Sequence, residues 1–131
     1  MNQKMSSLTN ALNWFEIPAT DINRAQKFYE SIFDIQMQPM EMMDMKMAMF
    51  PWSAEHGKVG GALVQSSMHK PGTTGSIIYL NANPDLQHTL NAVQKANGSI
   101  LMPKTLIDEN SGYMALISDT EGNTIGLHSN G

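Results

Sequence analysis

The chain has 131 residues, of which 41% are hydrophobic and 15% charged, a composition typical of a folded globular domain rather than a disordered segment. It contains no cysteine, which excludes disulfides, thiolate nucleophiles and cysteine zinc sites. Its 12 acidic residues outnumber 8 dispersed basic ones, so we expect no nucleic-acid partner. The first ten residues are polar, and no segment approaches the roughly 20 apolar residues of a membrane span. We therefore expect a cytoplasmic protein with no membrane partner.

The first half of the chain predicts a strand, a helix and three further strands. A strand is expected over 11–18. A helix over 21–33 follows, capped by Thr20 or Asp21, with apolar residues recurring every three or four positions. Three more strands are then expected, over 35–40, 43–49 and 59–64.

Most of the 12 methionines lie between Met37 and Met49, and they occupy every second position of the 43–49 strand. Flexible thioethers fill irregular gaps in a core. They also suit a plastic ligand surface or a site for a soft metal such as Cu(I), so the sequence leaves these interpretations open.

The second half repeats the same order of elements. A strand over 76–82 precedes a helix that begins at Asn83-Pro84-Asp85, with Asn83 as its cap, and stops at Asn97-Gly98. Three strands are expected after it, over 99–102, 113–118 and 124–128.

The two halves align with each other without a gap. Asp85 lies 64 positions after Asp21, and the same shift brings other apolar and proline positions together. We therefore predict an α+β fold in which two βαβββ modules form a curved mixed sheet around a cleft, a usual place for small ligands. The predicted boundaries are one domain over 1–131, with modules over about 10–67 and 74–130.

Three groups of residues carry a family resemblance: NWFEIPATD at 13–21 with Arg24-Ala25 and Phe28-Tyr29-Glu30, GGALV at 60–64, and DTEGN with IGLH between 119 and 128. They resemble the vicinal oxygen chelate superfamily, which includes glyoxalases, bleomycin-resistance proteins and extradiol dioxygenases. The resemblance implies paired βαβββ modules, often in a homodimer. Metal-dependent members hold one divalent ion in the trough through His or Glu side chains from the first and last strand of each module.

The resemblance places these metal-ligand positions at Trp14, Ala62, Ile78 and Gly126. None of these side chains can bind a hard or borderline cation. We therefore expect no metal and no cofactor.

Two residues further along each strand lie Glu16, Val64, Leu80 and His128. Glu16 and His128 are the titratable pair that this pattern places in the trough, and they are the candidate catalytic acid and base. They could equally form a structural pair or never meet. The remaining histidines, His56, His69 and His88, are expected on the surface.

Aromatic residues add ligand-binding candidates. Trp14 would either line the trough as a stacking surface or pack in the core, and Trp52 would line the cleft mouth or anchor a loop. The candidate ligand-binding residues are Trp14, Trp52, Val64, Ile78 and Leu80.

The sequence is compatible with three functions. The favoured one is a metal-independent small-molecule binding protein of the bleomycin-resistance type. The alternative is a lyase, isomerase or dioxygenase-type enzyme of the same superfamily, using a displaced metal or acid–base chemistry by Glu16 and His128. The third is a regulatory domain whose trough is filled by its own side chains.

Overall fold

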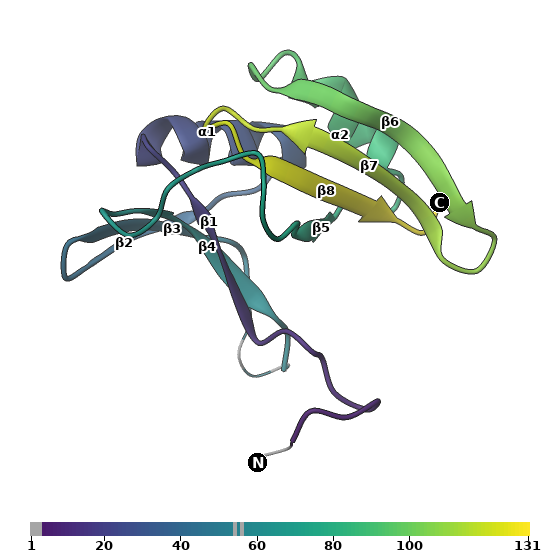
Figure 1. Ribbon diagram of the computed structural model, residues 1–131, viewed down its shortest axis with the longest axis horizontal. Coiled ribbons are helices and arrows are strands. Elements are labelled where there is room, and N and C mark those ends of the chain that lie inside the picture. The colour runs from purple at the N-terminus through teal and green to yellow at the C-terminus, as the bar shows by residue number, and fades with distance from the viewer. Residues whose placement is uncertain (1–3, 54, 56) are drawn as a thin grey trace.

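The computed structural model describes residues 4–53, 55 and 57–131, so His56 lies outside the described residues. Each half of the chain forms a four-stranded sheet with one helix packed on it (Figure 1). The first half contains β1 (Trp14–Pro18), α1 (Ile22–Phe33), β2 (Gln38–Met42), β3 (Met45–Met49) and β4 (Gly60–Gln65). The second contains β5 (Tyr79–Asn81), α2 (Leu86–Val93), β6 (Ser99–Asp108), β7 (Gly112–Ser118) and β8 (Thr124–Ser129). The predicted α+β class is confirmed.

Both sheets have the same topology. Their strand orders are β1-β4-β3-β2 and β5-β8-β7-β6, and the first and last strands of each half are parallel neighbours. β1 and β5 are therefore edge strands, and among the described residues no hydrogen-bonded ladder joins the two sheets. The halves meet instead through α1 and α2, which pack against each other. In the described part of the chain, neither helix is long and apolar enough to cross a membrane.

The main hydrophobic core contains residues from both halves, and Tyr29 of α1 lies fully buried within it. The Tyr29 hydroxyl donates a hydrogen bond of 2.7 Å to Oδ2 of Asp119 in the second half. Burial, reinforced by the Asp119 carboxylate, raises the pKa of Tyr29 well above its ordinary value. This contact fixes α1 against the loop that precedes β8.

Glu121 forms a second connection between the halves. Its carboxylate accepts hydrogen bonds from Arg24 Nε at 2.7 Å and from the backbone N–H groups of Thr20 and Asp21 at 2.8 Å. Burial alone would raise the pKa of Glu121, but the hydrogen bonds from Arg24 and the Asp21 backbone lower it overall. The second half thereby supplies a negative charge at the N-terminus of α1, where the helix dipole favours one.

The helix ends differ in detail from the prediction. Asp21 caps α1, since its Oδ1 accepts from the N–H groups of Asn23 and Arg24. Asp85 rather than Asn83 caps α2, so that prediction is wrong; the Asn83 side chain accepts from the N–H of Asn130 instead.

The chain after α2 also differs from the prediction. The helix stops at Val93, and Asn97 rather than Gly98 adopts the left-handed conformation, with φ of 74°. Gly98 is needed for space, because a Cβ there would lie 2.6 Å from the Phe28 ring.

The gap-free alignment of the two halves is wrong in the first strand. Glu16 lies opposite Ala62 on the neighbouring strand, and Tyr79 lies opposite Gly126. Gly126 is 64 positions after Ala62, but Tyr79 is only 63 after Glu16, so module two has one extra residue between its strand and its helix. A shift of one residue along a strand exchanges its two faces.

Several strands also differ from their predicted extents. β2 and β3 form a hairpin with Met43 in the turn at φ 55°, so the strand expected over 35–40 lies instead at 38–42, and the strand expected over 43–49 begins only at Met45. β6 continues past Pro103 to Asp108. An edge strand tolerates proline because its outer N–H groups have no ladder partner, and the pairing of β6 is irregular at this point.

Candidate functional site

The side of the first sheet turned away from α1 carries most of the predicted site. Side chains directly opposite each other on neighbouring strands share one face of a sheet. The strand register therefore defines what we call the first open face: Trp14, Glu16, Met40, Met42, Met45, Met47, Met49, Ala62 and Val64. Met47, Ala62 and Val64 are buried in a small cluster separate from the main core, with Trp14 packed against it.

Two tryptophans meet at one end of this face. The rings of Trp14 and Trp52 lie edge to face, with centroids 5.8 Å apart and planes at 75°. Trp52 is 48% exposed, and its indole N–H donates to the Lys58 carbonyl at 2.6 Å. A Cβ at Gly60 would lie 2.6 Å from the Trp52 ring, so a glycine on β4 is what allows the indole to lie there. The pair offers an aromatic surface to a ligand.

The polar part of the first open face centres on Glu16. Its Oε1 lies 2.7 Å from Nε2 of His69, and its Oε2 accepts a hydrogen bond of 3.2 Å from the Trp14 indole. The other ring nitrogen of His69 lies 2.6 Å from the Ser66 hydroxyl. The three side chains thus form a chain of hydrogen bonds beside the tryptophans. A carboxylate next to an imidazole can accept and donate protons.

His69 is the residue that the sequence interpretation missed. It was expected on the surface, but its side chain is only 18% exposed, so that expectation is wrong. The position of His69 is determined locally, because Ser66 and His69 close a tight turn directly after β4. Its pairing with Glu16, 53 residues away, has no sequence signal. The surface expectation is confirmed for His88, which is exposed.

The structure does not bring Glu16 and His128 into contact. His128 Nε2 lies 2.6 Å from the Ser111 carbonyl oxygen, at the far end of the second sheet. His128 belongs to the second open face, on the side of that sheet turned away from α2. The register assigns this face Tyr79, Asn81, Met102, Met114, Leu116, Gly126 and His128.

Ile78 and Leu80 lie on the opposite side of β5 from the second open face. Leu80 is only 8% exposed and pairs with Leu127 in the main core, and Ile78 packs against the same core. Their predicted placement beside Glu16 and Val64 is wrong because of the one-residue shift in this strand. Tyr79 takes the outward position instead, with its ring directly over Gly126.

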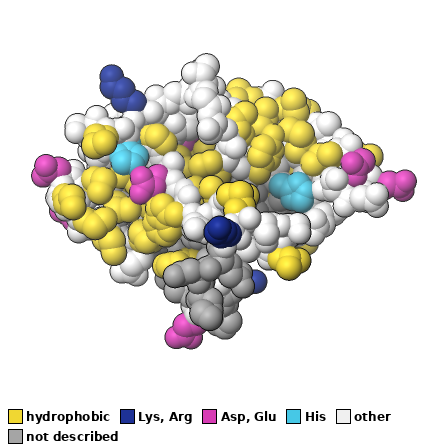
Figure 2. All heavy atoms as spheres, turned by 60° about the horizontal axis from the view of Figure 1, so that its bottom comes forward, with side chains coloured by type: hydrophobic (Ala, Val, Ile, Leu, Met, Phe, Trp, Pro, Cys, Tyr) yellow, Lys and Arg dark blue, Asp and Glu magenta, His cyan; other side chains and the backbone are white. Residues whose placement is uncertain are grey.

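Apolar side chains gather on both open faces. Figure 2 shows two groups of hydrophobic side chains on this side of the molecule, each with a histidine, and in one group the histidine lies beside an acidic side chain. The exposed residues include Met40 and Met42 on the first face, Trp52 beside Trp14, and Tyr79 and Met102 on the second face.

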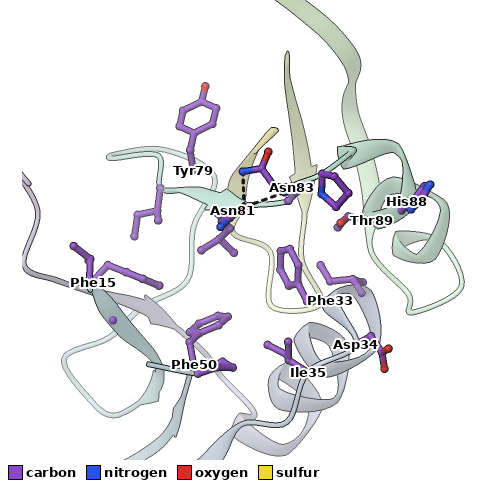
Figure 3. A pocket seen from close by; sticks show the side chains of 18 of the residues that line it. Phe15, Phe33, Asp34, Ile35, Phe50, Tyr79, Asn81, Asn83, His88 and Thr89 are labelled. Carbon is purple, nitrogen blue, oxygen red and sulfur yellow. Dashed lines mark hydrogen bonds between the residues drawn. The ribbon is translucent and has the colours of Figure 1, made fainter. Parts of the chain in front are cut away.

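A cleft of about 940 Å³ lies on the helix side of β1 and β5 (Figure 3). Its first-half wall includes the rings of Phe15, Phe33 and Phe50, with Asp34 beside them. Its second-half wall includes Ile78 and Leu80 together with two amides, and the Asn83 side chain donates to Oδ1 of Asn81 at 2.9 Å. The cleft therefore offers both apolar rings and polar groups to a ligand.

The residues at the metal-ligand positions do not fit a divalent ion. With β5 shifted by one residue, the second-half position equivalent to Trp14 is Ile77, just before β5, rather than the predicted Ile78. The side chains of Trp14, Ala62, Ile77 and Gly126 have no atom that can bind a divalent metal ion. Within the described residues, no group of three or more His, Asp or Glu side chains could hold a metal ion.

Comparisons with known proteins agree with this architecture. The model of the family "bleomycin resistance protein-like N-terminal" matches residues 12–52. A "glyoxylase-like domain-containing protein" from Didymella fabae is 30% identical over 118 residues, covering 89% of this chain and 91% of that protein.

Solved structures with little sequence identity share the fold. A glyoxalase/bleomycin resistance protein from Albidiferax ferrireducens superimposes with a TM-score of 0.66 at 16% identity, over 92% of this chain and 98% of that one. An E144Q glyoxalase I mutant from Zea mays gives a TM-score of 0.66 at 17% identity, over 89% of this chain but only 46% of that one. A hypothetical protein from S. aureus gives 0.65 at 18% identity, over 98% and 95%.

Proposed function

Because the chain belongs to the vicinal oxygen chelate superfamily, among its glyoxalase-like and bleomycin-resistance-like members, we propose that it binds a small aromatic molecule on the first open face without a divalent metal ion. The observation that carries this proposal is Trp14. Its indole stands where metal-dependent relatives are expected to place a metal ligand, and it meets the exposed Trp52 ring at 5.8 Å. The neighbouring methionines are flexible and polarizable, so they adapt to a flat ligand.

A homodimer completes this proposal. Within one chain the two open faces belong to separate sheets, and both expose large apolar side chains. In a homodimer, the second open face of each copy would pack against the first open face of the other copy. This contact would cover the apolar side chains of both faces and enclose the ligand. A cytoplasmic location belongs to the same proposal and rests on the cysteine-free composition.

The dimer has a direct test by sedimentation equilibrium. We expect Tyr79→Glu, on the second open face, to weaken self-association by about 2 kcal/mol or more, because it would place a charge in an apolar contact. The matched control is Leu106→Glu, on an exposed residue of the other face of the same sheet. A monomeric wild type, or equal weakening by both variants, would contradict the dimer.

A thermal-shift screen with a panel of small aromatic compounds tests ligand binding. A compound that binds the folded chain and not the unfolded chain raises its Tm by an amount that grows with the ratio of free ligand concentration to Kd. We expect Trp14→Leu to abolish the shift, and Phe33→Leu, which alters the helix-side cleft, to preserve it. No response from any compound, or loss only in Phe33→Leu, would overturn the proposal.

A second candidate function is proton transfer on a bound substrate, as in a lyase or isomerase. It is favoured by the contact of 2.7 Å between Glu16 and His69. His69 also lines a hollow of about 400 Å³ whose charged residues are Lys46, Lys70 and Asp44, so an anionic substrate would find more positive than negative charge there. A Glu16→Gln variant that binds a screening hit but loses its turnover would support catalysis, and unchanged turnover would exclude Glu16 as the base.

A further inference from the structure

The β2–β3 hairpin holds a set of methionines that ligand binding near Trp14 does not explain. Met40 and Met42 on β2 lie directly opposite Met47 and Met45 on β3. All four side chains belong to the first open face. We call them the methionine quartet.

Core packing accounts for only part of this quartet. Met47 is 4% exposed and fills a gap beside Val64. Met40 and Met42 are each 45% exposed, so they do not serve to fill a core. Exposed strand positions are ordinarily taken by polar residues, as Glu41 and Lys46 are on the other face of this hairpin.

The spacing lets the four sulfurs converge. Directly opposite residues have Cβ atoms about 5 Å apart, and same-face neighbours on one strand are separated by about 7 Å. A methionine side chain has three rotatable bonds, so its sulfur can swing over several ångströms. Three or four thioethers can therefore reach one ion that enters from the exposed side at Met40 and Met42.

The donor type determines which ion would bind. Thioether sulfur is neutral and soft, and it selects Cu(I) over Mg²⁺, Ca²⁺ or Mn²⁺, which prefer oxygen donors. His69 lies on the same side of the sheet, but both of its ring nitrogens have partners, Glu16 and Ser66. The donor set is therefore sulfur alone.

We propose that the methionine quartet binds one soft monovalent cation, Cu(I), for which Ag(I) is a redox-inert substitute. This site is separate from the superfamily's divalent metal position. The strands that carry the quartet, β3 and β2, are two and three strands away from β1 in the sheet, so their backbones lie about 10 Å or more from that of Trp14. The proposal also stands independently of the aromatic ligand.

Titration of the full chain with Ag(I), followed by native mass spectrometry, tests the proposal. We expect one Ag(I) per chain. An anaerobic competition against a chromophoric Cu(I) chelator, with ascorbate present, should show the same stoichiometry for Cu(I). The double variant Met42→Leu/Met45→Leu keeps volume and hydrophobicity, and it should lower affinity for both ions by about tenfold or more.

The matched control is Met5→Leu/Met68→Leu, which removes two exposed thioethers outside the hairpin. It should bind both ions like the wild type. Thermal denaturation without metal verifies that each variant is folded, and Met40→Leu replaces the double variant if that one is not. Equal loss in the control, unchanged affinity in the quartet variants, or binding of Zn²⁺ as tight as that of Ag(I) would overturn the proposal.

Discussion

Glu16 organises the polar end of the first open face through its two carboxylate oxygens. One oxygen lies 2.7 Å from His69, and the other accepts from the Trp14 indole at 3.2 Å. Trp14 is thereby held with one edge toward a negative charge and its ring toward Trp52. This combination suits a ligand that has a flat apolar ring and a hydrogen-bond donor.

The buried Tyr29 hydroxyl contributes to stability through its hydrogen bond to Asp119. Tyr29→Phe removes the hydrogen bond to Asp119 and should lower the free energy of unfolding at pH 7 by about 1–3 kcal/mol in denaturant titrations. The pKa of Tyr29 is raised on folding, so its contribution is complete below the unfolded value near 10 and is lost as pH rises further.

The difference between wild type and Tyr29→Phe should therefore shrink above about pH 10. The exposed Tyr79→Phe serves as control and should change stability at pH 7 by less than about 0.5 kcal/mol. A difference between wild type and Tyr29→Phe that stays constant into the alkaline range would show that Tyr29 ionises equally in both states.

At the scale of the elements, one extra residue before α2 decides which side chains reach the open faces. It shifts β5 by one position relative to β1, so Tyr79 takes the place that Leu80 was expected to take. The side chains that lie over two glycines agree with this shift. A Cβ at Gly61 would lie 2.4 Å from Phe15 on the helix side, and a Cβ at Gly126 would lie 2.4 Å from Tyr79 on the open side.

These glycines form a matched pair of variants. Phe15 is partly buried and packs 5.5 Å from the Phe50 ring, so Gly61→Ala should destabilise the fold by about 1–3 kcal/mol. Tyr79 is exposed and can swing away, so Gly126→Ala should cost less than about 1 kcal/mol in the same denaturant titration. The reverse order would contradict the strand register.

The sequence predicted the order of elements well because periodicity and helix caps are local signals. Both helices follow from apolar spacing and from cap signals at Asp21 and in the segment 83–85, although the cap in that segment is Asp85 rather than the predicted Asn83. The register of β5 could not be predicted, since a single residue added in a connection leaves the strand pattern unchanged. The site was predicted in part: Trp14, Glu16 and Val64 share a face, but the partner of Glu16 is set by a turn 53 residues away.

At the scale of the whole molecule, the two halves contact each other on the helix side, whereas on the sheet side their open faces are not covered by the rest of the described chain. Tyr29 with Asp119, and Arg24 with Glu121, connect the halves across the helices. On the sheet side the two open faces remain separate, and both expose large apolar side chains. This arrangement is the basis for proposing that a second copy completes the ligand site.

Glu121→Gln tests the connection between the halves. The Glu121 side chain is fully buried, and its carboxylate accepts hydrogen bonds from Arg24 and from two backbone N–H groups. The variant should therefore lower the free energy of unfolding by about 1–3 kcal/mol at pH 7. The pKa of Glu121 is lowered on folding, so its contribution is present above the unfolded value and is lost as pH falls. Denaturant titrations should show the two proteins converging below about pH 4. A constant difference from pH 7 to pH 3 would contradict this assignment.

Methyl-labelled methionine makes the binding surface directly visible by NMR. A screening hit, added to the labelled chain in the presence of EDTA, should shift the Trp14 indole resonance and the methyl resonance of Met49, which packs against the same cluster as Trp14 on the first open face. Shifts confined to Phe33 and Ile35 in the helix-side cleft, or shifts that appear only after a divalent metal is added, would contradict metal-independent binding beside Trp14.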